Sequence, residues 1–130
     1  MVVIVCGGRN YKDYCRVKKV LDVVNRTYKN LRIVHGGAPG ADSLADRWAK
    51  ECNIPVKTYK ADWKKYGKAA GPIRNKQMLD EEKPDYVIAF PGGKGTQNMV
   101  EQALNAQIFV MQIFNTNEQY TAKIKKNFSK

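Results

Sequence analysis

Short runs of apolar residues alternate along the chain with stretches in which apolar residues recur at helical spacing. The runs are typical of buried β-strands, and they predict strands at 2–6, 31–35, 55–59, 86–90 and 108–113. The stretches between them predict helices over 17–28, 41–52 and 72–81, and a further helix capped by Thr96. Residues 60–71 have no clear period, and we expect them to form a loop.

This alternation predicts an α/β fold: a doubly wound three-layer sandwich around a mostly parallel five-stranded sheet in the order 3-2-1-4-5. Ligands bind such sheets beyond the carboxyl ends of the strands, where the winding reverses. Here that point lies between the first and fourth strands. No linker or repeat divides residues 1–130, so we expect a single domain, with a polar and basic tail from about 117 interpreted as a last helix.

Composition narrows the classes of protein. The 130 residues include 23 Lys and Arg against 12 Asp and Glu, a net charge of +11, with 43% hydrophobic residues. The basic excess indicates an anionic partner: nucleic acid, a phosphorylated small molecule or an acidic protein surface. No apolar run is long enough to span a membrane, and the N-terminus lacks a basic leader. The three cysteines, an odd number, favour a cytoplasmic protein without disulfides.

Eight of the ten glycines fall into three clusters, which follow the first, second and fourth predicted strands. Parallel strands end at the same edge of a sheet, so we expect the clusters to meet at one rim. The segment PGGKGT at 91–96 is suited to phosphate, because glycines admit close approach and a helix N-terminus favours an anion. Lys94 and Thr96 add donors. The spacing is not that of a Walker loop, so ATP hydrolysis is not implied.

The first two clusters bring further candidates. Arg9 is a planar donor suited to phosphate, Asn10 to a base or sugar, and Tyr11 to stacking. Asp42 has two interpretations: it stabilises a helix terminus, or it accepts a hydrogen bond from a ribose hydroxyl. His35 is either a strand-end residue satisfied by the backbone or a group that contacts ligand and transfers a proton.

The helix predicted from 72 carries Arg74 and Asn75 near its start. A cation there opposes the helix dipole, which favours a binding role for Arg74. Asp62 and Trp63 precede this helix and are candidates for a wall of the pocket, although Trp63 is equally compatible with simple packing. No group of His, Cys and carboxylates has the spacing of metal ligands, so we predict neither a metal site nor another cofactor. Mg²⁺ arriving with ligand phosphates is compatible with the sequence.

The expected ligand-binding residues come from the three glycine clusters and the helix after 72. They are Gly7, Gly8, Arg9, Asn10, Tyr11, His35, Gly36, Gly37, Gly40, Ala41, Asp42, Arg74, Asn75, Pro91, Gly92, Gly93, Lys94, Gly95 and Thr96. The candidates for a catalytic role are Asp42, Asp62 and Arg74.

Four blocks in order carry a resemblance to a known family: CGGRNY, HGGAPGADSLADRWA, ADWKKYGKAAGPIRNKQML and AFPGGKGT. Together they resemble the YspA-like, cpYpsA-related branch of the SLOG superfamily, which groups DprA/Smf proteins with LOG phosphoribohydrolases. The resemblance covers roughly residues 2–107. It implies a Rossmann-like fold and a nucleotide or nucleotide-derived ligand on the glycine loops.

The LOG enzymes, which cleave the base from a nucleoside monophosphate, carry the pattern PGGxGTxxE and an upstream helix arginine. Residues 91–96 and Arg74 match this pattern, but Met99 stands at the position of the glutamate. Glu101 lies about 200° around the helix from Met99, so it does not simply replace the missing group. Glycosidic cleavage usually needs a carboxylate near the sugar, so the resemblance implies binding more directly than hydrolysis.

Three functions follow as hypotheses. The first is a sensor or sequestering protein for a nucleotide, an NAD- or ADP-ribose-like molecule or a cyclic nucleotide. The second is a hydrolase of N-glycosidic or phosphate-ester bonds, with Asp42 or Asp62 as carboxylate. The third is binding of single-stranded nucleic acid, as in DprA relatives, although the basic residues are spread along the chain as on a solvated surface. A homo-oligomer is also expected, with 110–114 and the helix around Met99 as its candidate face.

Overall fold

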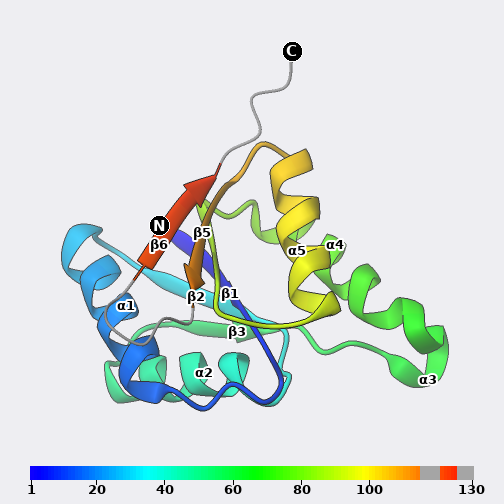
Figure 1. The fold of residues 1–130 in the computed structure, drawn as a ribbon, viewed down its shortest axis with the longest axis horizontal. Helices are drawn as coiled ribbons and strands as arrows, with labels where there is room; N and C mark the ends of the chain where they lie inside the picture. Colours follow the sequence, from blue (N-terminus) through cyan, green and yellow to red (C-terminus); the bar gives the residue numbers. More distant parts are fainter. Residues whose placement is uncertain (115–120, 126–130) are drawn as a thin grey trace.

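A parallel sheet forms the centre of the fold. The computed structural model describes residues 1–114 and 121–125. The five parallel strands of the sheet have the order β3-β2-β1-β4-β5, which confirms the sequence prediction (Figure 1). They are β1 (Val2–Cys6), β2 (Arg32–His35), β3 (Val56–Thr58), β4 (Tyr86–Ala89) and β5 (Phe109–Phe114). The winding reverses between β1 and β4, as expected.

A sixth strand was not predicted. β6 (Thr121–Lys125) pairs antiparallel with β5, with Ile124 opposite Met111. The interpretation of the tail as a last helix is therefore wrong for these residues, and the rest of the tail lies outside the described residues. The sequence TAKIK alternates polar and apolar residues, and this two-residue period is the strand signal that the basic composition obscured.

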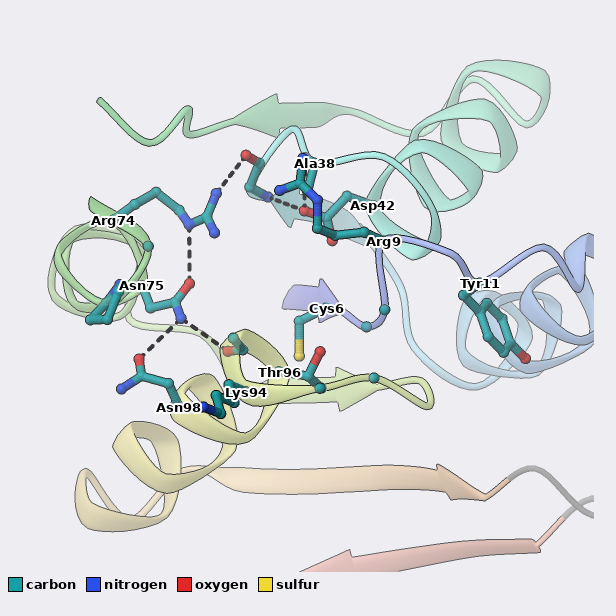
Figure 2. Close-up of a pocket in the computed structure, with 18 of the residues that line it drawn as sticks. Cys6, Arg9, Tyr11, Ala38, Asp42, Arg74, Asn75, Lys94, Thr96 and Asn98 are labelled. Atoms are coloured by element: carbon teal, nitrogen blue, oxygen red, sulfur yellow. Dashed lines mark hydrogen bonds between the residues drawn. The ribbon is translucent and has the colours of Figure 1, made fainter. Parts of the chain in front are cut away.

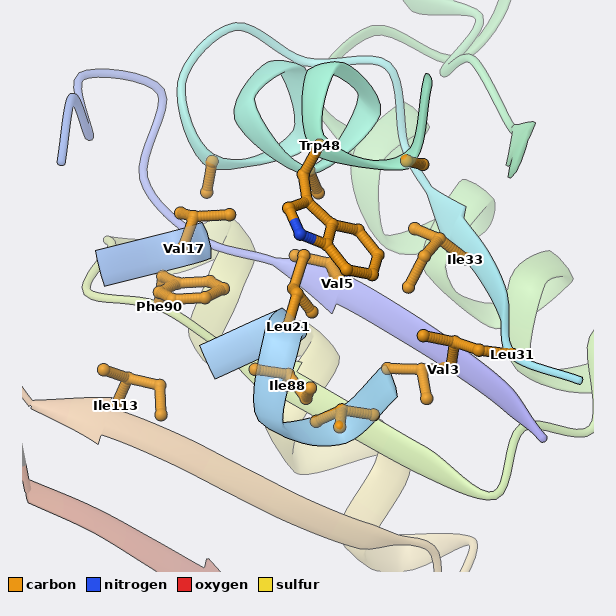
Figure 3. Packing of buried hydrophobic residues seen from close by; sticks show 14 residues of the cluster. Val3, Val5, Val17, Leu21, Leu31, Ile33, Trp48, Ile88, Phe90 and Ile113 are labelled. Carbon is orange, nitrogen blue, oxygen red and sulfur yellow. The ribbon is translucent and has the colours of Figure 1, made fainter. Parts of the chain in front are cut away.

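The residues of each strand point alternately to two helical layers. On one face, Val3 and Val5 of β1 pack with α1 (Tyr14–Thr27) and α2 (Ala41–Glu51), around the fully buried Trp48 (Figure 3). On the other face, Ile4 packs with α4 (Ala70–Glu82) and α5 (Lys94–Asn105). Burial on both faces explains why β1 is a continuous apolar run.

Part of the face expected to form a dimer belongs to this core, whereas Phe114 at the end of the same segment is 40% exposed. Met99 and Val110 are fully buried in the cluster between the sheet and the α4–α5 layer, and Ile113 is buried in the opposite cluster. β6 also covers the edge of β5. These three side chains therefore cannot contact a second copy in this fold, because they are already packed within the chain.

The segment predicted as a loop contains a short helix. Asp62 accepts a hydrogen bond from the backbone N–H of Lys65 and so caps α3 (Trp63–Tyr66). A 3₁₀ turn, η1 (Gly67–Ala69), leads into α4. Figure 1 shows α3 at the end of the α4 layer, away from the sheet.

The start of α5 also differs from the prediction. The helix begins at Lys94, with Gly93 at the N-cap position, and no side chain caps it. Thr96 therefore lies in the first turn rather than before it. In the part of the chain that the structure describes, no helix combines the length and the apolar character needed to cross a membrane.

Candidate functional site

A cavity of about 930 Å³ lies at the carboxyl ends of the central strands (Figure 2). All three glycine clusters contribute to its wall. The predicted residues that line it are Gly7, Gly8, Arg9, Asn10, Tyr11, Gly36, Asp42, Arg74, Asn75, Pro91, Gly92, Gly93, Lys94, Gly95 and Thr96. The predicted residues outside its lining are His35, Gly37, Gly40, Ala41 and Asp62.

Backbone contacts hold the three loops together. The N–H of Gly8 donates to the carbonyl of Pro91 over 2.8 Å, and the N–H of Ala41 donates to the carbonyl of Gly8 over 3.1 Å. A Cβ at Gly40 would lie only 2.1 Å from the same Gly8 oxygen, and Gly40 has a φ of +83°. Gly40 and Ala41 therefore position the rim without lining the cavity.

At two other glycines, no contact within the protein requires the absence of a side chain. A Cβ added at Gly93 or at Gly95 would meet nothing within 4 Å, and neither residue has a left-handed φ. Both line the cavity at the start of α5, where no capping side chain and no acidic residue occupy the first turn. The positive end of the helix dipole therefore faces the cavity, next to backbone that a ligand can approach closely.

Arg74 is held in place by polar contacts to the loop after β2. Its Nη1 donates to the carbonyl of Gly36 over 2.6 Å, and its Nε donates to Oδ1 of Asn75 over 3.0 Å. Burial lowers the pKa of Arg74; the carboxyl of Asp42 opposes this shift, whereas the positive charge of Arg9 adds to it. Two guanidinium groups thus repel one another across a cavity suited to an anion.

Asn75 joins α4 to α5. The side chain is only 4% exposed, and its Nδ2 donates to the carbonyl of Gly95 over 3.4 Å and to Oδ1 of Asn98 over 3.1 Å. Asn98 in turn accepts a hydrogen bond from Gln102. Figure 2 shows Arg74, Asn75 and Asn98 joined by these hydrogen bonds along one wall of the cavity. It fixes Arg74 relative to the start of α5.

Asp42 is a buried carboxyl that shapes its own loop. Its Oδ2 accepts hydrogen bonds from the N–H groups of Gly36 and Ala38, at 3.1 and 3.2 Å. Burial raises the pKa of Asp42, and these hydrogen bonds and the charge of Arg74 oppose the shift without reversing it. Burial likewise raises the pKa of the Cys6 thiol, which also lines the cavity. That thiol stays protonated and is a poor nucleophile.

His35 is satisfied within the protein. It is 3% exposed, its Nδ1 accepts from the N–H of Gly37, and its Nε2 lies 2.8 Å from Oδ1 of Asp46. An acceptor at Nδ1 leaves the proton on Nε2, which therefore donates to Asp46. This geometry favours the structural interpretation of His35 over ligand contact.

The two aromatic candidates differ in position. The ring of Tyr11 packs on Phe90, with 5.5 Å between centroids, and Figure 2 shows it directed away from Arg74 and Asn98. Trp63 lines the cavity and is 52% exposed. Asp62, beside it, is engaged in capping α3.

Several lining residues were not among the predicted ligand-binding residues. They are Val5, Cys6, Ala38, Trp63, Lys68, Gly71, Pro72, Met78 and Asn98. Of these, Trp63 had been a candidate for the wall of the pocket. Asn98 also carried a signal, because it lies four residues after Lys94 and hence on the same side of the predicted helix. Lys68 and Gly71 were obscured by the interpretation of 60–71 as a loop.

The carboxylates available for catalysis are few. Met99 is fully buried in the core, and Glu101 is exposed, accepts from Gln97 and lies outside the lining of this cavity. Among the described lining residues, Asp42 is the one carboxyl. Residues 1–114 and 121–125 contain no group of three His, Cys, Asp or Glu placed to hold a metal ion.

Comparison with known proteins agrees with this architecture. The solved X-ray structure of TM1055, a Northeast Structural Genomics Consortium target, superposes with a TM-score of 0.63 at 19% identity, over 84% of this chain and 71% of that chain. The Gene 61 protein of Mycobacterium phage D29 is 38% identical over 117 residues, which span 84% of this chain and 93% of that protein. The model of the YspA, cpYpsA-related SLOG family matches residues 1–66, which include the first two glycine loops and α3. The chain belongs to the YspA, cpYpsA-related SLOG family.

Proposed function

We propose that the protein binds a nucleotide or nucleotide-derived ligand in this cavity, with a phosphate at the start of α5. The observation that carries the proposal is the uncapped N-terminus of α5, where Gly93 and Gly95 leave open space at the cavity. Anions bind such helix ends. Membership of the SLOG family supports a nucleotide-related function in general.

The charges around the cavity support the same ligand class. Four cations line it, namely Arg9, Lys68, Arg74 and Lys94, against the single carboxyl of Asp42 among the described lining residues. Arg74 presents a planar fork of donors that matches phosphate oxygens, and Lys94 is an exposed residue of the first turn of α5. A polyphosphate or diphosphate bridge gives each of these cations an oxygen to bind.

The biological role that we propose is sensing or sequestration of the ligand. The position that carries the LOG glutamate is Met99, whose side chain is buried in the core and does not line the cavity. A site that lacks this carboxylate retains the phosphate contacts, so it holds its ligand without the group that glycosidic cleavage usually requires.

Calorimetry and thermal shift with AMP, NAD, ADP-ribose, cyclic dinucleotides and ribose 5-phosphate test the proposal. At least one phosphate compound should raise the melting temperature, and Arg74→Ala and Lys94→Ala should each weaken its binding about tenfold or more, the effect of losing a charged hydrogen bond. The matched control is Lys76→Ala, an exposed lysine of α4 that pairs with Asp80 outside the cavity lining. Absence of binding by every compound rejects the proposal.

A second candidate function is hydrolysis of the bound nucleotide. A buried carboxyl with a raised pKa in a ligand cavity is the kind of group that acts as a general acid, and Asp42 is buried, has a raised pKa and lines this cavity. Incubation of the same compounds with concentrated protein should then release free base or ribose phosphate, and Asp42→Asn should abolish the release. No product after several hours excludes hydrolysis and leaves binding.

Single-stranded nucleic acid remains a predicted partner, as does a second copy of the chain. Many cations of the described surface pair with nearby carboxylates, among them Lys18 with Asp22, Lys50 with Asp46, and Lys76 with Asp80. Gel-shift assays at several salt concentrations test the first partner, because binding through the phosphate backbone must weaken as salt rises. Light scattering tests the second.

A further inference from the structure

One aromatic side chain at the mouth of the cavity is left without packing over much of its surface. Trp63 is 52% exposed, whereas Trp48, the other tryptophan, is fully buried and donates from its indole Nε1 to Asp22. Tryptophan is highly buried on average in folded proteins, so an indole exposed at a cavity is informative.

The local structure holds this indole against α4. Asp62 caps α3 and fixes the residue that follows it, and the turn at Gly67 (φ +57°) returns the chain through η1 into α4. A Cβ at Gly71 would lie 3.4 Å from Cη2 of Trp63, so the six-membered ring rests closely on a residue without a side chain. Gly71 lines the cavity as well.

The position of Trp63 at the cavity distinguishes it from the other exposed apolar side chains of this region. Tyr66 at the end of α3 and Ile73 in α4 are each 41% exposed, but neither lines the cavity, whereas Trp63 does. The other aromatic at the cavity, Tyr11, packs its ring on Phe90. Of these two aromatics of the described lining, Trp63 is the more exposed and offers the larger ring surface to a ligand.

We infer that Trp63 is the stacking platform for the nucleobase of the ligand, with the phosphate at the start of α5 inside the same cavity. The inference rests on the proposed function and adds the base as a recognised group. Aromatic side chains stack on every base because each base has a flat π face. The four cations of the cavity contact the phosphates and the indole stacks on the base, so the ligand must carry a phosphate and a base.

The two tryptophans provide a direct test by fluorescence. ADP-ribose should quench the emission of the wild-type protein, because stacking on Trp63 brings the base against the exposed indole. In Trp63→Phe the remaining emission comes from the buried Trp48 and should not respond to ADP-ribose. Trp63→Phe should keep most of the affinity, because a phenyl ring still stacks.

Affinities measured by calorimetry separate the base from the phosphate. Trp63→Ala should weaken the binding of ADP-ribose about tenfold or more, which is the loss expected for one stacked base. Ribose 5-phosphate should bind this variant as tightly as it binds the wild type. The matched control is Tyr66→Ala, an exposed aromatic on the same helix, which should leave both affinities unchanged. If Trp63→Ala fails to fold, the wild-type and Trp63→Phe measurements decide.

The outcomes distinguish this inference from the proposed function. If ADP-ribose binds in a manner that depends on Arg74 while Trp63 emission and the Trp63→Ala affinity stay unchanged, the inference fails and the proposed function stands. If Trp63→Ala weakens ADP-ribose and ribose 5-phosphate equally, Trp63 supports the wall of the cavity and the inference also fails. If AMP, NAD, ADP-ribose, the cyclic dinucleotides and ribose 5-phosphate all fail to bind the wild type, both are wrong.

Discussion

Nη1 of Arg74 lies 2.6 Å from the carbonyl oxygen of Gly36, and this hydrogen bond joins α4 to the loop that follows β2. The contact is possible because Gly36 has no side chain: a Cβ there would lie 2.3 Å from Nη1. The glycine thus sets the position of the guanidinium that faces the cavity.

Gly36→Ala should therefore act through Arg74. The backbone of Gly36 is not in the left-handed region, so alanine is tolerated and the flexible arginine moves instead. We expect ADP-ribose to bind about tenfold or more weakly, as in Arg74→Ala, since both variants lose charged hydrogen bonds. In calorimetry the double variant Gly36→Ala/Arg74→Ala should bind ADP-ribose no more weakly than Arg74→Ala alone. Full additivity of the two losses would show that Gly36 acts by another route.

Gly40→Ala should destabilise the fold itself. The residue has a φ of +83°, and a Cβ would lie 2.1 Å from the carbonyl oxygen of Gly8, a backbone atom that cannot move freely. We expect the free energy of unfolding to fall by about 2 kcal/mol or more, measured by urea denaturation. An unchanged midpoint would contradict the close contact between these two loops.

Gly95→Ala should have opposite effects on stability and on binding. Gly95 lies in the first turn of α5, and a Cβ there meets no protein atom. Alanine should stabilise the helix by about 0.5–1 kcal/mol, because it loses less backbone entropy than glycine. The added methyl group also occupies the space that we assign to the ligand. A higher melting temperature together with weaker ADP-ribose binding is the expected pair of results, and unchanged binding would argue against a ligand at this point.

Glu82 should carry much of the acid sensitivity of the fold. Its side chain is 4% exposed and pairs with Arg32 of β2 and Lys57 of β3. Burial alone would raise its pKa, but the hydrogen bond from Tyr59 and the charges of Arg32 and Lys57 hold the pKa below its usual 4.5. A lowered folded pKa gives stability that is present above the unfolded value and is lost as the pH falls through the folded one.

Glu82→Gln should thus lower the free energy of unfolding at pH 7 by about 1–3 kcal/mol, the usual cost of breaking hydrogen bonds to a charged group. The difference between the variant and the wild type should shrink below pH 4.5. Urea denaturation across this range measures both effects. Glu101→Gln, at an exposed position of α5, is the control and should change neither.

Asp42 should change the pH dependence of stability in the direction opposite to that of Glu82. Because burial raises its pKa above the usual 3.8, the folded state binds the proton more tightly than the unfolded state does. The wild type should then lose stability relative to Asp42→Asn as the pH rises from 3.8 through the raised pKa, and the difference should be constant above it. The same titration of Asp80→Asn, at an exposed position on α4, provides the comparison. A wild type that instead gains stability relative to Asp42→Asn as the pH rises would reverse the sign of the shift.

The sequence predicted the parallel sheet and the meeting of the three glycine loops, because both follow from strands buried on two faces. It did not separate glycines by role: Gly40 and Gly93 look alike in sequence, but one avoids a backbone clash and the other leaves open space. Distinguishing them requires the distance between segments that are far apart in the chain. The same holds for His35, whose partner Asp46 lies on the next helix.

Two elements that differ from the sequence prediction, α3 and β6, are both short. The four residues of α3 are too few to show a helical period, although Asp62 followed by Trp63 offered a capping signal. The five residues of β6 alternate polar and apolar residues, but the basic composition of the tail obscured this strand pattern. Both elements are too short for their pattern to stand out in the sequence.

The backbone hydrogen bonds among the three glycine loops have a consequence for how the site changes during evolution. Since the rim is joined through main-chain atoms of Gly8, Ala41 and Pro91, its shape depends little on which side chains surround it. The exposed α3–η1 segment, by contrast, contributes the side chains of Trp63 and Lys68 to the cavity lining. Substitutions in this segment can therefore change the side chains that face the cavity without changing the backbone contacts that join the rim.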